Sequence, residues 1–264
     1  MVIDFHVHAF DERIAEKAIS KLETIGNIKA FHRGTIRETI ECFDKWGVDK
    51  GVLVPIATKP SQQKTINDWA FAQASDRIIP FGSVHPDAED VFEELERIKL
   101  MGMKGIKFHP DYQNFMIDDE RMFPIYKKCA EIGLIVVFHS GYDFLSPDLI
   151  HARPQASARA FKAVPEMTMV LAHLGGMKLY DDVEKYLVGL KGNLYFDTAL
   201  TSTCVDKTQF ERIVKNHGAD RILLASDSPW HETSGEIALV KSLGISDEKK
   251  ELILHKNAER LLGL

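Results

Sequence analysis

Short apolar runs alternate with longer amphipathic stretches along almost the whole chain of 264 residues. Several runs are apolar at nearly every position, which is typical of parallel strands covered on both faces. We expect eight strands, at residues 2–8, 51–56, 78–84, 104–109, 134–139, 167–173, 193–198 and 221–227. Eight strand–helix units in about 250 residues favour closure into a barrel. We therefore predict an α/β fold with a single (β/α)8 TIM-like barrel domain over residues 1–264; an open doubly wound sheet is the alternative.

The stretches between the strands add detail to this barrel. Helical patterns occupy residues 92–101, 119–133, 181–190 and 209–218. Asp119 and Asp181 are expected to cap the second and third of these helices at their N-termini. The region from Phe10 to Trp46 is too long for one ordinary connection, so it predicts a first helix plus an inserted segment over the barrel mouth. Residues 246–264 read as one or two terminal helices on the outside.

The composition excludes several classes of partner. The net charge is −6 and no basic cluster is present, which argues against binding to nucleic acid or to a membrane surface. No apolar run approaches the roughly 18 residues of a membrane span, and the N-terminus lacks the pattern of a signal peptide. Cys42, Cys129 and Cys204 are widely separated, which suits reduced thiols. We therefore expect a cytoplasmic protein with a small-molecule substrate.

Histidines gather at the ends of the predicted strands. Of the eleven histidines, five end a strand, and a sixth, His85, lies one residue beyond the third strand. The five are His6, His8, His109, His139 and His173. The eighth strand ends in Asp227. The carboxyl ends of the strands of such a barrel form one face, where the active site lies, so these residues are expected to converge.

This convergence predicts a metal site. His6 and His8 are two residues apart on one strand, so both side chains point to the same face. His139 and Asp227 would complete a set of nitrogen and oxygen ligands suited to zinc or another divalent metal. A single strand-end histidine is more often a hydrogen-bonded rim residue, and His-x-His alone is a weak signal. The joint pattern of histidines and one aspartate across five strands carries the prediction.

The sequence resembles the amidohydrolase superfamily over essentially its whole length. The nearest branch is the one that includes the aminocarboxymuconate-semialdehyde decarboxylase type. The motifs that carry the resemblance are IDFHVH, GIKFHPDYQNF, VVFHSG, LAHLGG, LLASDSPW and the closing KNAERLL. These motifs identify the superfamily and leave the substrate open. By analogy with the family we also expect a homo-oligomer, such as a dimer.

The resemblance implies a role for each matching residue. His6, His8 and His139 match metal ligands, and Asp227 matches the aspartate that binds metal and transfers protons. His173 matches a histidine that binds a second metal in binuclear members and otherwise contacts the substrate or the activated water; we count it as catalytic with Asp227.

The fourth strand leaves the number of metal ions open. Binuclear members often carry a carboxylated lysine there, and Lys107 stands at that place. We favour one ion, most simply zinc, and keep two as the alternative. Lys107 and His109 would then contact substrate, or Lys107 would pair with Asp4, whose alternation predicts an inward side chain. Lys107, His109 and Arg153 near the site favour a substrate that carries a carboxylate.

Three functions remain at this stage. The first is a metal-dependent hydrolase in which Asp227 is the general base for a metal-activated water. The second uses the same residues to decarboxylate an unsaturated or aromatic acid. The third is a barrel that binds metal or metabolite without catalysis.

Overall fold

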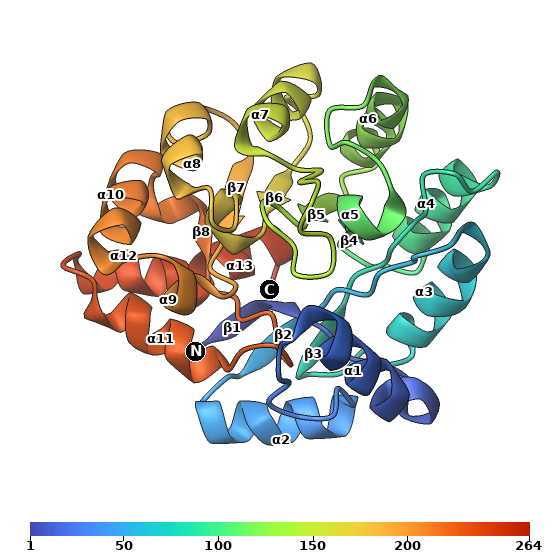
Figure 1. The fold of residues 1–264 in the computed structure, drawn as a ribbon, viewed down its shortest axis with the longest axis horizontal. Coiled ribbons are helices and arrows are strands. Elements are labelled where there is room, and N and C mark those ends of the chain that lie inside the picture. Colours follow the sequence, from blue (N-terminus) through green and yellow to red (C-terminus); the bar gives the residue numbers. More distant parts are fainter.

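A computed structural model describes residues 1–264 and contains eight parallel strands at the centre of the molecule (Figure 1). The strands are β1 Ile3–Val7, β2 Lys50–Leu53, β3 Ile78–Pro80, β4 Gly105–Phe108, β5 Ile135–Phe138, β6 Met169–Leu171, β7 Leu194–Asp197 and β8 Ile222–Leu223. Seven lie inside their predicted ranges, and β2 begins one residue before the predicted 51–56. The predicted TIM-like barrel is confirmed.

Two regular ladders and two single bridges make up the barrel. Strands β1 to β3 form one parallel ladder and β4 to β8 form the other. Gly82 bridges to Ile106 between β3 and β4, and Val7 bridges to Ser228 between β8 and β1. The Phe5 N–H donates to the Leu224 carbonyl at 2.8 Å, which adds to the contact between the first and last strands. The last strand therefore lies beside the first, as a barrel requires.

Helices surround the strands on all sides (Figure 1). The α-helices are α1 Glu12–Gly26, α2 Ile36–Trp46, α3 Gln63–Phe71, α4 Val91–Leu100, α5 Pro110–Gln113, α6 Phe123–Glu131, α7 Pro154–Ala163, α8 Tyr180–Tyr186, α9 Thr201–Cys204, α10 Lys207–His217, α11 Thr233–Ser242, α12 Asp247–Glu251 and α13 Asn257–Leu262. Short 3-10 turns are η1 Pro60–Gln62, η2 Glu120–Met122, η3 His173–Gly175 and η4 Ala219–Arg221, and the π-helical segment η5 Leu252–Lys256 joins α12 to α13. None of these helices combines the length and apolarity needed to cross a bilayer.

The predicted insertion after the first strand consists of α1 and the chain that leads to α2, and it contributes Leu22 and Ile28 to the cavity described below. Asp119 caps η2, because its side chain accepts from the Arg121 N–H. The prediction for Asp181 is wrong: α8 begins one residue earlier, and the Asp181 carboxylate accepts from Gln209 Nε2 at 2.9 Å.

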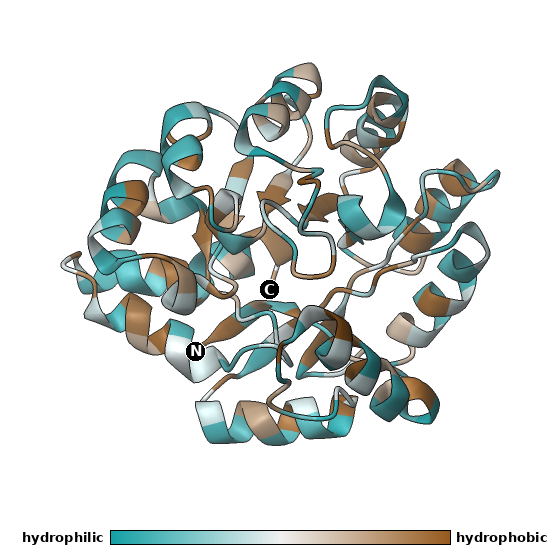
Figure 2. Cartoon of the chain, in the orientation of Figure 1, coloured by the Kyte–Doolittle hydropathy of each residue, from teal (hydrophilic) through white to brown (hydrophobic).

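The hydrophobic core has two parts, inside and outside the strands. A cluster of 14 buried residues, including Val52, Val137 and Val170, fills the barrel interior. A larger cluster of 50 packs the outer faces of the strands against the helices. Figure 2 shows the matching hydropathy pattern, with apolar strands and helices that are hydrophilic on their outer faces. The three cysteines are free thiols.

Candidate active site

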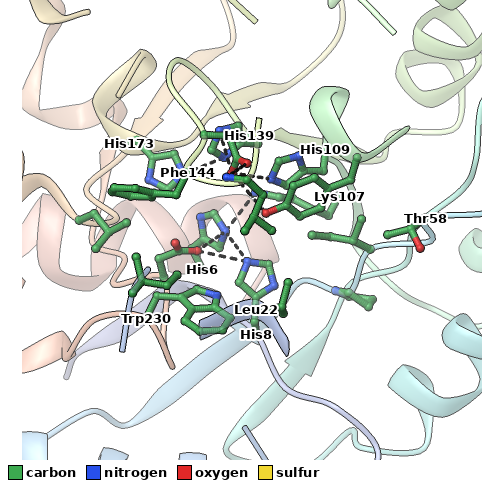
Figure 3. Close-up of a pocket in the computed structure, with 18 of the residues that line it drawn as sticks. His6, His8, Leu22, Thr58, Lys107, His109, His139, Phe144, His173 and Trp230 are labelled. Atoms are coloured by element: carbon green, nitrogen blue, oxygen red, sulfur yellow. Dashed lines mark hydrogen bonds and ion pairs between the residues drawn. The ribbon is translucent and has the colours of Figure 1, made fainter. Parts of the chain in front are cut away.

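A cavity of about 270 Å³ lies at the carboxyl ends of the strands (Figure 3). Its polar lining consists of His6, His8, Thr58, Lys107, His109, Tyr112, His139, Asp143, His173 and Asp227. Twelve of its 22 lining residues are hydrophobic, among them Leu22, Phe144 and Trp230. The volume is near the lower end of the roughly 300–1,000 Å³ of small-molecule sites, so the cavity suits a small ligand.

His6, His8 and Asp227 form a compact group of possible metal ligands at the base of this cavity. The Nε2 atoms of His6 and His8 lie 3.1 Å apart, and each lies 3.2 Å from Asp227 Oδ1. Four ligand atoms about 2.1 Å from a tetrahedral zinc ion lie roughly 3.4 Å from one another. The three residues thus fit a divalent ion in both donor type and spacing.

The protonation states suit the same role. Burial, reinforced by the charge of Lys107, lowers the pKa of His6 well below its ordinary value, so its imidazole is neutral. Burial alone would raise the pKa of Asp227, but His6, His8 and His173 outweigh it and lower that pKa to about 2. A neutral imidazole and an ionised carboxylate are the forms that bind metal.

An irregularity in β1 aims both histidines into the cavity. The register with β2 shifts between Asp4 and Val7. Phe5 packs inside the barrel, and His6, the next residue, also faces inward, as does His8. Regular alternation would have placed Asp4 on the same face as the histidines. The shift separates it from them.

The expected ion pair between Asp4 and Lys107 is therefore wrong. The Asp4 carboxylate accepts from the hydroxyls of Ser226 and Thr233, both at 2.6 Å, and its burial raises its pKa to about 6. Lys107 is fully buried, with Nζ 3.0 Å from His6 Nε2, and burial lowers its pKa to about 8. Lys107 is the only lysine or arginine that lines the cavity.

Asp197, at the end of β7, is a functional candidate that the sequence reasoning missed. Its Oδ2 lies 2.8 Å from His6 Nδ1, while Oδ1 accepts from the backbone N–H groups of His173 and Ala199. A proton on Nδ1 leaves the Nε2 lone pair of His6 free to face His8 and Asp227. Carboxylates commonly orient metal-binding histidines in this way. The signal was present in the sequence, because NLYFDT also ends a strand with an aspartate.

Replacing Asp197 with asparagine is expected to weaken metal binding by about 10- to 100-fold, the usual effect of losing such a partner. The amide keeps the shape but loses the charge that makes His6 a stronger ligand. Titration of manganese and zinc against a competing chelator measures the change, with a melting curve to establish that the variant is folded. Wild-type affinity in the folded variant would show that Asp197 only supports the backbone.

His139 and His173 face each other beside this group rather than within it. His173 Nδ1 lies 3.1 Å from the Ala199 carbonyl, and His173 Nε2 lies 3.1 Å from His139 Nδ1. Two lone pairs at that distance repel, so a proton or a cation must lie between the two rings. The role of His139 as a metal ligand stays a prediction.

His109 belongs to a stack of rings at one side of the cavity. The Tyr112 ring lies 3.5 Å from the His109 ring and the His139 ring lies 4.2 Å from it, centroid to centroid. Asp143, in the loop after β5, faces the edge of this stack, with Oδ2 3.6 Å from His109 Nε2 and 3.8 Å from His139 Nε2. The sequence reasoning missed Asp143 and Tyr112, since neither belongs to a strand.

Arg153 is not brought to the site. It is exposed, stands directly before α7 and does not line the cavity. Its predicted role in substrate binding has no support from this cavity and stays a prediction. His85 also lies outside the lining.

A parallel barrel with a histidine and aspartate group at the carboxyl ends of its strands defines a metal-dependent barrel enzyme. The chain belongs to the amidohydrolase family, whose model matches residues 3–264. The resemblance noted in the motifs is thereby confirmed. No protein of curated function matches the chain in sequence.

Solved structures with the same fold have low sequence identity to the chain. A TIM-barrel protein from Bordetella bronchiseptica is 20% identical with a TM-score of 0.79, over 99% of this chain and 98% of that one. A 5-carboxyvanillate decarboxylase from Sphingomonas paucimobilis is 15% identical with a TM-score of 0.74, over 100% and 99%. A dihydroxybenzoic acid decarboxylase from Polaromonas sp. JS666, with bound manganese and the inhibitor 2-nitroresorcinol, is 16% identical with a TM-score of 0.76, over 100% and 97%.

Proposed function

We propose that this enzyme decarboxylates a small aromatic or unsaturated carboxylic acid. The observation that carries the proposal is the cavity itself: it is small and mostly apolar, and its one cationic side chain, Lys107, lies beside the His6, His8 and Asp227 group. An apolar wall suits a planar ring, and a cation beside a metal group suits one carboxylate. The decarboxylases that share the fold support this choice over hydrolysis.

We propose one divalent ion, held by His6, His8 and Asp227, with His139 as the fourth ligand predicted from the sequence. The ion would act as a Lewis acid that draws electron density from an oxygen of the substrate. Zinc remains the prediction from the ligand types, and manganese is the ion bound in the Polaromonas decarboxylase. In this proposal Lys107 is an unmodified amine.

The residues around the ion would share the remaining work. Lys107 would neutralise substrate charge at the base of the cavity. Loss of CO2 leaves a carbanion-like carbon that must gain one proton. We assign the transfer of that proton to the carboxylate of Asp227, which would take it from water or from a substrate hydroxyl and deliver it to the carbon. His173 would donate to a substrate oxygen.

Hydrolysis is the second candidate, and one observation favours it. Asp227 has a pKa of about 2, so it is a carboxylate in the resting enzyme and ready to accept a proton from an attacking water. The substrate would then be a small amide, ester or lactone whose leaving group receives that proton.

A paired assay is expected to separate these reactions. The metal-loaded enzyme is incubated with hydroxybenzoic and unsaturated acids while CO2 is measured, and in parallel with small lactones and amides while released acid is measured. We expect CO2 release from at least one acid, abolished by a chelator and restored by manganese or zinc. Release of acid from a lactone or amide, with no CO2 from any acid, would overturn the proposal in favour of hydrolysis.

A further inference from the structure

We infer that Asp143, with the hydroxyl of Tyr112 and the edge of His109, forms a subsite for an O–H or N–H donor on the substrate. Substrates with a hydroxyl or amino group would be selected there, and substrates with a second carboxylate would be rejected. This inference rests on the proposed decarboxylation, because it specifies which ring acids the enzyme accepts.

The Asp143 carboxylate is anchored but has spare capacity to accept hydrogen bonds. Oδ1 accepts from the Leu145 N–H at 2.8 Å, and Oδ2 accepts from the Tyr112 hydroxyl at 3.3 Å. A carboxylate has about four lone-pair positions, so roughly two remain. The side chain lines the cavity although it is only 9% exposed. The carboxylate therefore borders the space that a ligand would fill.

No cation neutralises this carboxylate. The ion-pair contacts of Asp143 within 4.0 Å are to the rings of His109 and His139 and to no lysine or arginine. A second carboxylate placed here would meet a like charge in a cavity with little water, which is unfavourable. A hydroxyl or an amine would instead give a charge-assisted hydrogen bond.

The geometry argues against a metal ion in the same place, although His109, His139 and Asp143 have metal-binding side chains close together. The lone pair of an imidazole nitrogen lies in the plane of its ring. The planes of His109 and His139 are only 9° from parallel and their centroids are 4.2 Å apart. One ion cannot lie in the planes of both rings when the rings are stacked in this way, so it cannot bind both lone pairs. Hydrogen bonding to a ligand is the role that remains.

Two ring nitrogens of the stack, His109 Nδ1 and His139 Nε2, lack a hydrogen-bond partner, and the second of them lies beside Asp143. His139 Nε2 is buried without a hydrogen-bond partner and lies 3.8 Å from Asp143 Oδ2, beyond hydrogen-bond distance. Buried polar atoms in native proteins nearly always have a partner, which can be a ligand. Because the two protein atoms are 3.8 Å apart, a substrate hydroxyl that donates to Asp143 Oδ2 would be placed to accept from His139 Nε2.

Binding measurements test the subsite separately from the chemistry. The probes are the hydroxybenzoates, the matching methoxybenzoates and the benzenedicarboxylates, each titrated calorimetrically into the manganese-loaded protein. For the best ring position, we expect the hydroxyl compound to bind at least about tenfold more tightly than its methyl ether, the scale of a hydrogen bond to a charged group. The dicarboxylate is expected to bind more weakly still.

The variant Asp143→Asn keeps an oxygen for the Leu145 N–H, so the loop conformation is retained. We expect it to bind the hydroxybenzoate several-fold more weakly and the dicarboxylate at least about tenfold more tightly, because the like charge is gone. Asp148→Asn is the matched control: Asp148 is an exposed residue of the same loop, and this variant should bind all the probes as wild type does.

The outcomes separate the two proposals. Equal binding of hydroxyl, methoxy and carboxylate probes by wild type, or an unchanged preference in Asp143→Asn, would overturn the subsite whether or not CO2 is released. The expected preference without CO2 release from any probe acid would support the subsite and count against decarboxylation. No binding of any ring acid would overturn the subsite and the decarboxylation of an aromatic acid.

Discussion

Replacing His8 with alanine is expected to abolish metal binding by the group of His6, His8 and Asp227, and to abolish turnover. The His8 imidazole lies 3.1 Å from His6 and 3.2 Å from Asp227, and its side chain is 13% exposed, so it fills no part of the deep core. Even the loss of an outer partner of a ligand costs about 10- to 100-fold in metal affinity, so the loss of a ligand should cost at least about a hundredfold. Metal content after dialysis should fall from about one ion per chain to a trace.

His85→Ala is the matched control for this prediction. His85 is also a buried histidine, in the connection that follows β3, but it does not line the cavity. We expect this variant to keep its metal and its activity even if its melting temperature falls. Full metal occupancy in both His8→Ala and His6→Ala would show that His6 and His8 are not metal ligands. Two ions per wild-type chain would favour a carboxylated Lys107 between two metals.

The strand ends were predictable because the barrel places them for simple reasons. Parallel strands buried on both faces leave nearly continuous apolar runs, and closure brings the ends of all eight to one face. His6, His8 and Asp227 could be predicted to meet although Asp227 lies at the far end of the chain. The same reasoning applied to NLYFDT would have found Asp197, whose contact with His6 no local pattern reveals.

Other parts of the site depend on contacts that sequence periodicity does not encode. The register shift in β1 turns Asp4 away from the histidines, and strict alternation cannot anticipate a shift. Asp143 and Arg153 stand in the same long connection after β5, and both appear equally suited to a surface loop. The fold buries the Asp143 carboxylate in the cavity and leaves the Arg153 guanidinium in solvent. Composition could therefore not predict which charged side chains line the cavity, nor which substrate they favour.

The substitution Asp227→Asn is expected to separate metal binding from proton transfer. Asp227 has a backbone φ of 71°, in the left-handed region that asparagine and aspartate tolerate better than other residues with side chains, so asparagine should preserve the turn. The amide oxygen can still face His6 and His8, but it cannot carry the proton. We expect substantial metal to remain, and turnover per bound metal to fall at least about a hundredfold, the scale of a general acid–base contribution.

The opposing view is that Asp227 only anchors the loop after β8. The contacts of its side chain argue against this view, because the carboxylate lies 3.2 Å from each of His6 and His8. The loop is held through backbone groups instead. The Asp227 N–H donates to the His6 carbonyl at 3.0 Å, and the Trp230 N–H donates to the Asp227 carbonyl at 2.9 Å. Asparagine leaves both backbone bonds in place. A loop anchor would therefore give a variant with a lower melting temperature and near-normal turnover per bound metal. That result, measured on folded and metal-loaded protein, would exclude Asp227 from proton transfer in either proposed reaction.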